Sequence, residues 1–250
     1  MPNRVSLPKE LLEGFLRLLF PANCEVCGAE LPQRQKIGLC PACWRQIELI
    51  RHPYCERCGK LLPDGIEELC LDCRVEPFPV ETRGAAVYHG AIVPLVHLFK
   101  YSFWPSLADQ LSGLIIERLH ALFPAWQPEA LIPVPLHKRR LRWRGFNQSL
   151  LLAKRLSPVW RVPVVEPLKR TRNTLPQVRL EPEARLVNIA GAFTITDIEA
   201  IRGKRLCLLD DVSTTGSTLG ECARVLLEAG AAEVRALVLA LPRSPEAELL

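Results

Sequence analysis

Two adjacent carboxylates and a group of hydroxyls follow a short apolar segment near the end of the chain. Residues 205–218 have the sequence Arg-Leu-Cys-Leu-Leu-Asp-Asp-Val-Ser-Thr-Thr-Gly-Ser-Thr. A buried strand over residues 205–209 places Asp210 and Asp211 at the carboxyl edge of a sheet, where open α/β sheets bind their ligands. Because carboxylates accept hydrogen bonds from neutral hydroxyls, the acid pair indicates a site for the hydroxyls of a sugar.

The residues after the acid pair suit a phosphate group. A helix is expected to begin within residues 214–218, and the first N–H groups of a helix have no intrahelical partner and attract anions. Hydroxyl donors surround Gly216, which permits close approach of the backbone. The segment predicted to bind a phosphorylated ribose comprises Asp210, Asp211, Val212, Ser213, Thr214, Thr215, Gly216, Ser217 and Thr218. The alternative interpretation is an ordinary strand, turn and capped helix.

This segment resembles the phosphoribosyl diphosphate loop of the type I phosphoribosyltransferases, in which four apolar residues and two acids precede Thr-Thr-Gly-Ser-Thr. Other phosphate-binding motifs fit less well. No lysine follows Gly216 as a Walker loop requires, and only Gly216 and Gly220 are present where a dinucleotide fingerprint needs three spaced glycines.

Eight cysteines form two nearly equal units in the first third of the chain. Each unit contains two Cys-x-x-Cys pairs, and the members are Cys24, Cys27, Cys40 and Cys43, followed by Cys55, Cys58, Cys70 and Cys73. Four thiolates at this spacing close a tetrahedral zinc site with no open position, so two structural zinc ions are predicted. The simplest pairing gives one ion to each unit, and an interleaved pairing is the alternative.

Disulfide bonds and redox chemistry are the competing interpretations of these cysteines. Disulfides need an oxidising compartment, and nothing in the sequence directs export. Four Cys-x-x-Cys pairs outside a thioredoxin-like pattern argue against redox chemistry. Zinc also changes the charge, because eight thiolates with two Zn²⁺ would lower the formal +5 to about +1. Cys207 and Cys222 lie in apolar patterns and are expected in the core.

Strand and helix patterns alternate after residue 80. Strands are expected over residues 82–88, 130–134, 192–195, 205–209 and 233–241, and helices over 92–101, 105–123, 147–156 and 217–229. This alternation predicts an α/β fold with a parallel sheet covered by helices on both faces. The chain thus divides into a double zinc-ribbon module over residues 1–78, with an amphipathic helix over 11–20, and an α/β domain over 79–250. No apolar run reaches membrane-spanning length, and the cytoplasm is the expected compartment.

A basic segment follows the strand at residues 130–134. Residues 130–165 contain eight Lys or Arg side chains and no acid. Three interpretations fit this segment: a solvated surface, a nucleic-acid contact assisted by Trp143 and Phe146, or a loop that binds a diphosphate. Its place one α/β unit before the ribose-phosphate segment favours the diphosphate, which needs cations and magnesium to neutralise it. A later polar stretch that contains Arg170, Arg172 and Arg185 suits either a lid or a surface hairpin.

Taken together, these motifs resemble the ComF/GntX family of competence and DNA-utilisation proteins. The resemblance rests on the double zinc ribbon, Pro133-Val-Pro135, Arg144-Gly-Phe-Asn-Gln148, Gln177, Arg185-x-x-Asn188 before Gly191-Ala-Phe193, and the Asp-Asp loop. It implies a type I phosphoribosyltransferase fold, a cytoplasmic location, a role in the uptake or use of DNA and a link to the helicase-like ATPase ComFA. It also implies that Pro135, Leu136, His137, Lys138 and Arg144 bind the diphosphate.

Two functions from different classes follow from the resemblance. The first is magnesium-dependent transfer of a phosphoribosyl group from phosphoribosyl diphosphate to an acceptor that no segment identifies. Purine-salvage enzymes often carry an acid at the position of Thr214, so a purine acceptor is not indicated. The second is a catalytically silent adaptor that binds a nucleotide or single-stranded DNA.

Overall fold

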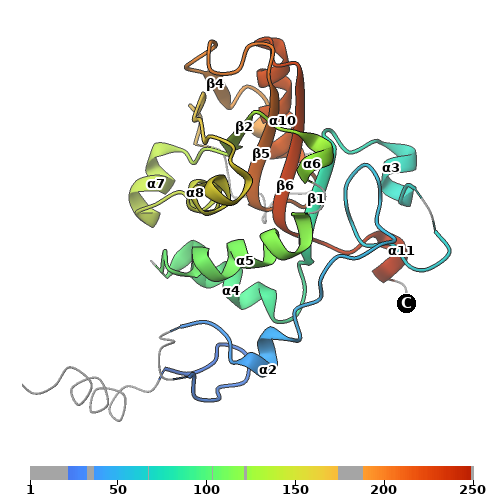
Figure 1. The fold of residues 1–250 in the computed structure, drawn as a ribbon, viewed down its shortest axis with the longest axis vertical. Helices are drawn as coiled ribbons and strands as arrows, with labels where there is room; N and C mark the ends of the chain where they lie inside the picture. Colours follow the sequence, from blue (N-terminus) through green and yellow to red (C-terminus); the bar gives the residue numbers. More distant parts are fainter. Residues whose placement is uncertain are drawn as a thin grey trace, which may run out of the picture.

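The computed structural model describes residues 22–32, 37–66, 68–102, 104–120, 123–173 and 188–248. Its centre is a four-stranded parallel sheet with the order β1-β6-β5-β2 (Figure 1). The strands are β1 (Thr82–Val87), β2 (Ala130–Pro133), β5 (Arg205–Val212) and β6 (Glu233–Leu241). The predicted parallel sheet is therefore confirmed, and β6 has the bounds expected from the sequence.

The strands contribute residues to two separate apolar clusters, as expected for a sheet that is covered on both faces. In β5, Cys207 and Leu209 join one cluster, whereas Leu206 and Leu208 join the other. The first cluster includes buried residues of α4 (Ile92–Tyr101), α5 (Leu107–Leu119) and α8 (Gln148–Trp160). The second includes the apolar face of α10 (Ser217–Glu228). Cys207 and Cys222 are fully buried core residues, as predicted.

Short segments cover both edges of the sheet. Residues 48–50 run antiparallel to β1, where the N–H of Ile50 donates to the carbonyl oxygen of Ala85 at 3.1 Å. Residues 163–165 lie beside β2, where the N–H of Val165 donates to the carbonyl oxygen of Leu131 at 3.0 Å. The carbonyl and N–H groups that an edge strand leaves open are thus partly paired on each side.

The two cysteine units lie on different sides of the sheet. The first contains α2 (Pro41–Trp44), and its buried residues join the cluster of α4 and α5. The second contains α3 (Leu71–Val75), which lies beside α11 (Pro245–Glu248) in Figure 1. There the side chain of Glu246 accepts a hydrogen bond from the N–H of Leu71 at 2.5 Å. The end of the chain therefore holds the second unit against the α/β domain.

Several elements differ from the sequence-based expectation. The predicted basic loop contains α7 (Lys138–Arg144), because His137 caps the start of this helix and Gly145, at φ 77°, ends it. The helix expected over 105–123 is α5 followed by the separate α6 (Phe123–Trp126), and α8 extends past residue 156 to Trp160. The polar stretch begins and ends in an antiparallel hairpin of β3 (Leu168–Arg170) and β4 (Phe193–Ile195). Among the described helices, none combines the length and apolar character that crossing a bilayer requires.

Candidate functional site

The acid pair lies near the carboxyl end of β5. The strand was expected to stop at Leu209 and instead continues to Val212, so both aspartates belong to it. Asp210 Oδ1 accepts hydrogen bonds from Ser149 Oγ and from the N–H of Asp211, both at 2.9 Å. Asp211 Oδ1 accepts one from the N–H of Val212 at 2.7 Å. Burial and the adjacent Asp211 carboxylate raise the pKa of Asp210 to about 6.

A lysine from a distant part of the chain pairs with Asp211. Lys100, in the last turn of α4, places Nζ 2.9 Å from Asp211 Oδ1, and both side chains are largely buried. Burial opposes the charge of Lys100, but the ion pair outweighs burial and raises the pKa of Lys100. This residue was not predicted as part of the site. No local motif marks it, because only the packing of α4 against α8 and the sheet brings it to Asp211.

The motif Arg144-Gly-Phe-Asn-Gln148 forms the junction that supports this site. Gln148 Nε2 donates to the carbonyl oxygen of Phe99 at 3.0 Å, and its Oε1 accepts a hydrogen bond from Arg144 at 3.0 Å. Asn147 caps α8 and donates to the carbonyl oxygen of Val134 at 3.1 Å. The motif thus joins α4, α7, α8 and the end of β2. It also places Ser149, a second residue that was not predicted, within hydrogen-bond distance of Asp210.

The loop expected to bind a diphosphate begins beside the acid pair. The N–H of Val134 donates to the carbonyl oxygen of Leu209 at 3.0 Å, so the loop leaves the sheet next to Asp210. Pro135 and Leu136 are partly buried, His137 is buried and Lys138 is exposed. Burial and the charges of Arg139 and Lys138 lower the pKa of His137, which favours a neutral imidazole.

The hydroxyl-rich segment turns from β5 into α10. Ser213, Gly216 and Ser217 are buried, and Val212, Thr214, Thr215 and Thr218 are partly buried. The side-chain hydroxyls of Thr215 and Ser217 lie 2.8 Å apart and are hydrogen-bonded. Helix α10 begins at Ser217, as predicted, and its start lies at the same edge of the sheet as the acid pair.

The hairpin β3–β4 contains a further buried cation. Arg170 is buried, and its guanidinium lies 5.4 Å from the centre of the Phe193 ring. Burial and, to a smaller extent, the charge of Arg140 lower the pKa of Arg170 to about 10. The charge of Asp210 acts on Arg170 in the opposite direction. An anionic ligand would relieve the repulsion between these cations.

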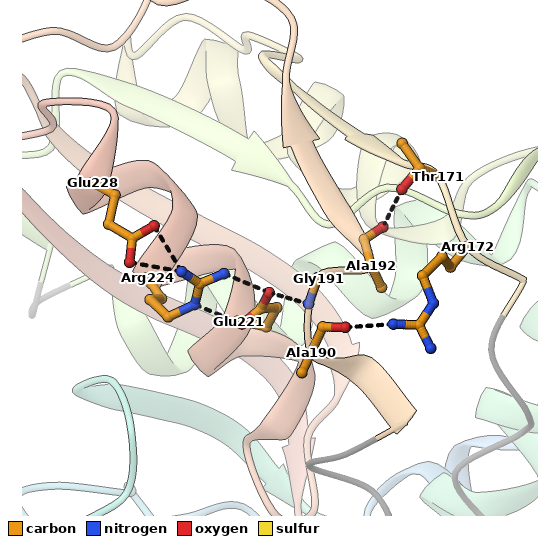
Figure 2. A network of polar contacts seen from close by, with 8 residues as sticks. All are labelled: Thr171, Arg172, Ala190, Gly191, Ala192, Glu221, Arg224 and Glu228. Atoms are coloured by element: carbon orange, nitrogen blue, oxygen red, sulfur yellow. Dashed lines mark hydrogen bonds and ion pairs between the residues drawn. The ribbon is translucent and has the colours of Figure 1, made fainter.

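Helix α10 holds the hairpin in place through a polar network (Figure 2). Glu221 accepts a hydrogen bond from the N–H of Gly191 at 2.7 Å and pairs with Arg224, which also pairs with Glu228. Arg172, by contrast, is exposed and donates to the carbonyl oxygen of Ala190 at 2.6 Å. Arg170 is therefore buried in the fold, whereas Arg172 lies at the surface. Gln177, Arg185 and the amphipathic segment 11–20 lie outside the described residues.

The eight paired cysteines form two separate four-thiol clusters. Cys24, Cys27, Cys40 and Cys43 make one, and Cys55, Cys58, Cys70 and Cys73 make the other, with the sulfur atoms of each cluster within 4.8 Å of one another. The structure thus selects the simple pairing over the interleaved one. Seven of the eight side chains are buried, and Cys27 is exposed. Four thiolates at this separation fit a structural Zn²⁺.

Each zinc site is expected to lose its ion independently. The protein should contain about two zinc ions per chain, and either Cys24→Ser or Cys55→Ser should lower the content by about one, because three thiolates hold zinc much more weakly than four. Metal analysis of the purified full chain measures this. Loss of both ions in either single variant would contradict two independent sites.

Sheet topology, acid pair, hydroxyl-rich turn and cysteine clusters together define a protein with a double zinc ribbon and a phosphoribosyltransferase fold. The family models agree: residues 15–74 match the double zinc ribbon domain, and residues 148–249 match the phosphoribosyl transferase domain. A solved structure, the Bacillus subtilis glutamine phosphoribosylpyrophosphate amidotransferase, aligns with a TM-score of 0.39 at 17% identity, over 56% of this chain and 30% of that chain.

Curated relatives extend the match over most of the chain. The DNA utilization protein YhgH of Escherichia coli K12 is 35% identical over 227 residues, which cover 87% of this chain and 96% of that protein. Competence protein F of Haemophilus influenzae is 34% identical over 222 residues, which cover 86% and 95%. The chain belongs to the ComF/GntX family of competence and DNA-utilisation proteins.

Proposed function

We propose that this protein binds phosphoribosyl diphosphate and acts in the cytoplasm in the use of incoming DNA. The observation that carries the proposal is one sheet edge with three parts: the acid pair, the hydroxyl-rich start of α10, and the cation-lined loop after β2. Their order matches the ribose hydroxyls, the 5-phosphate and the diphosphate of one molecule. The link to DNA rests on the names of the relatives, a DNA utilization protein and a competence protein.

The chemistry of the residues suits phosphoribosyl transfer to an acceptor. Asp210 and Asp211 would orient the ribose through its hydroxyls, and the N–H and hydroxyl groups of residues 214–218 would hold the 5-phosphate. Arg144 and the loop of residues 135–138 would stabilise the negative charge that develops on the departing diphosphate. Positioning and charge stabilisation of this kind accelerate transfer without a dedicated acid or base.

Magnesium fits this edge as an ion that arrives with the diphosphate. Mg²⁺ is usually held by one or two carboxylates together with substrate phosphates, and the site offers two carboxylates beside a loop for phosphate. Asp211 already pairs with Lys100, so these side chains do not form a closed protein cage for the ion. When bound, magnesium would neutralise part of the diphosphate charge. Asp210 and Asp211 would keep the ribose in place beside it.

Calorimetry on the full chain tests the proposal. Phosphoribosyl diphosphate should bind in the presence of magnesium and more weakly without it, and ribose 5-phosphate should compete. Absence of binding by the wild-type protein would contradict the proposal. Diphosphate release that depends on an added acceptor would then distinguish a transferase from a binding protein.

The affinity for phosphoribosyl diphosphate should depend on the protonation of Asp210. The pKa of Asp210 is raised from 3.8 to about 6, so its carboxylate is about one-tenth ionised at pH 5. If the carboxylate binds the ribose, affinity should rise about tenfold from pH 5 to pH 7, and Asp210→Asn should remove most of this dependence. An equal pH dependence in Asp210→Asn would contradict the assignment.

The raised pKa of Asp210 also makes the free energy of unfolding fall as the pH rises. The folded protein holds its Asp210 proton to about pH 6, whereas an unfolded chain releases it near the ordinary value of 3.8. Ionisation therefore costs more in the folded state, and the contribution of Asp210 to stability is lost as the pH rises through 6. Asp210→Asn should reduce this loss, which denaturation at pH 5 and pH 7 measures.

Single-stranded DNA binding is the second candidate function. Trp143 is 57% exposed and Tyr101 is 45% exposed, and their rings lie 5.7 Å apart beside the basic residues of α7. Exposed rings next to cations suit stacked bases and a phosphate backbone. Phe146 does not contribute to this surface, because it packs against Phe99 with the ring centres 5.9 Å apart.

Replacing Trp143 and Arg142 by alanine should weaken single-stranded DNA binding at least about tenfold if this surface carries it, since each stacked base contributes about 1–3 kcal/mol. Wild-type affinity should fall steeply with salt. Arg202→Ala, at an exposed position on another part of the surface, is the matched control. If both variants bound single-stranded DNA equally well, or if binding did not depend on salt, the surface of α7 would not be the DNA-binding site.

A further inference from the structure

A phenyl ring from the end of the second zinc ribbon lies against the backbone of the hydroxyl-rich turn. Gly216 has a φ of +74°, and a Cβ added there would lie 2.4 Å from Cζ of Phe78. One turn later, a Cβ on Gly220 would lie 2.6 Å from Cβ of Pro79. Both glycines are thus explained by contact with residues 78 and 79, which occupy the space that a side chain would need.

Phe78 is itself held by the second zinc site. Its ring belongs to the buried cluster formed by Cys55, Cys58, Cys70 and Cys73 with Leu62. Its carbonyl oxygen accepts a hydrogen bond from Arg57 Nε at 2.5 Å, and Arg57 lies between two of the cysteines. The carbonyl oxygen of Arg57 in turn accepts a hydrogen bond from the N–H of Thr82 at 3.0 Å. A continuous series of contacts therefore links the zinc ligands to Phe78 and to the first residue of β1.

This contact supports the turn whose backbone N–H groups would bind the 5-phosphate. N–H groups bind a phosphate well only when several of them already point at one position, because ordering a loop on binding costs affinity. Phe78 packs on the turn at Gly216, directly before the first residue of α10. The diphosphate side of the site is supported differently, by Gln148 and Asn147. The two ends of a bound ligand would thus depend on separate supports.

We propose that Phe78 is a positioning residue for the phosphate-binding turn, and that the second zinc site keeps Phe78 in place. The proposal rests on the proposed function, since it assigns the turn to a 5-phosphate. It makes affinity for the phosphate depend on the metal content of the second ribbon. The first ribbon lies in a different cluster and does not share this contact.

The first test compares two ligands that occupy different ends of the site, ribose 5-phosphate and inorganic diphosphate, by calorimetry on the full chain. Phe78→Ala should weaken ribose 5-phosphate binding about tenfold and leave diphosphate binding within about twofold, and Phe78→Leu should restore part of the affinity. If the role of Phe78 were merely structural, Phe78→Ala would lower the affinity for both ligands to a similar extent. Leu31→Ala, a truncation of a buried leucine in the first ribbon, is the matched control and should retain ribose 5-phosphate affinity.

The second test compares the two zinc sites. Cys58→Ser should weaken ribose 5-phosphate binding several-fold more than Cys24→Ser, although each variant loses about one zinc ion. Equal effects of the two cysteine variants, or loss of both ligands in Phe78→Ala, would overturn the positioning role while leaving ligand binding intact. Failure of the wild-type protein to bind ribose 5-phosphate would instead overturn the proposed function itself, and this inference with it.

Discussion

The Asp211→Asn protein is expected to bind phosphoribosyl diphosphate at least about 100-fold more weakly than the wild type. The substitution keeps the shape of the side chain but removes the carboxylate. This carboxylate pairs with Lys100 and would accept hydrogen bonds from the ribose hydroxyls. Lys100 then keeps a largely buried ammonium without its carboxylate, which costs about 3 kcal/mol or more when such a pair is broken. Calorimetry and denaturation of the same preparation measure both effects.

Two controls separate the loss of binding from the loss of stability. Asp197→Asn removes the same charge from an exposed turn, where the carboxylate accepts a hydrogen bond from the N–H of Ala200. This control should retain wild-type affinity. Adding Lys100→Met to Asp211→Asn should recover part of the stability without recovering binding. Wild-type affinity in Asp211→Asn would contradict the role of this carboxylate in the site.

Gly59→Ala is expected to destabilise the protein by about 3 kcal/mol or more. Gly59 has a φ of +73°, which costs about 1 kcal/mol for alanine, and its Cβ would lie 2.4 Å from the backbone oxygen of Thr82. A backbone atom cannot rotate away, so the second ribbon would have to separate from β1. Denaturant unfolding measures the change.

The first ribbon supplies a closely matched control. Gly28 occupies the same place after a Cys-x-x-Cys pair, with a φ of +72°, and a Cβ added there would have no neighbour within 4 Å among the described residues. Gly28→Ala should therefore cost only the backbone strain of about 1 kcal/mol. Equal destabilisation by both substitutions would show that the contact between Gly59 and β1 contributes nothing.

The elements with regular patterns were predictable from the sequence. Strand β6 and helix α4 have the expected bounds, because an apolar run and a helical period each cover the whole element. Helix α7 was missed, because seven mostly charged residues without a buried side chain give no apolar period. Its end at Gly145 was a usable signal, since glycine is common just after a helix. Strands β3 and β4 are three residues each, too short for a periodic pattern.

The candidate site was predictable only in its local parts. The acid pair and the hydroxyl-rich turn are contiguous, so their residue types and order indicate the chemistry directly. Lys100 precedes Asp211 by more than a hundred residues, and only the packing of α4 brings the two together. Phe78 likewise gives no signal of its contact with Gly216, because that contact depends on how the second ribbon packs on the sheet. Long-range contacts of this kind need the folded structure.

The covered edges of the sheet restrict how this protein can self-associate. Residues 48–50 lie along β1 and residues 163–165 along β2, so the outer strands already have neighbours from the same chain. A second copy therefore cannot readily extend the sheet by strand addition, a route that leads other α/β proteins to continuous intermolecular sheets and to aggregation. A homodimer of this protein is therefore expected to use surfaces other than the outer edges of β1 and β2.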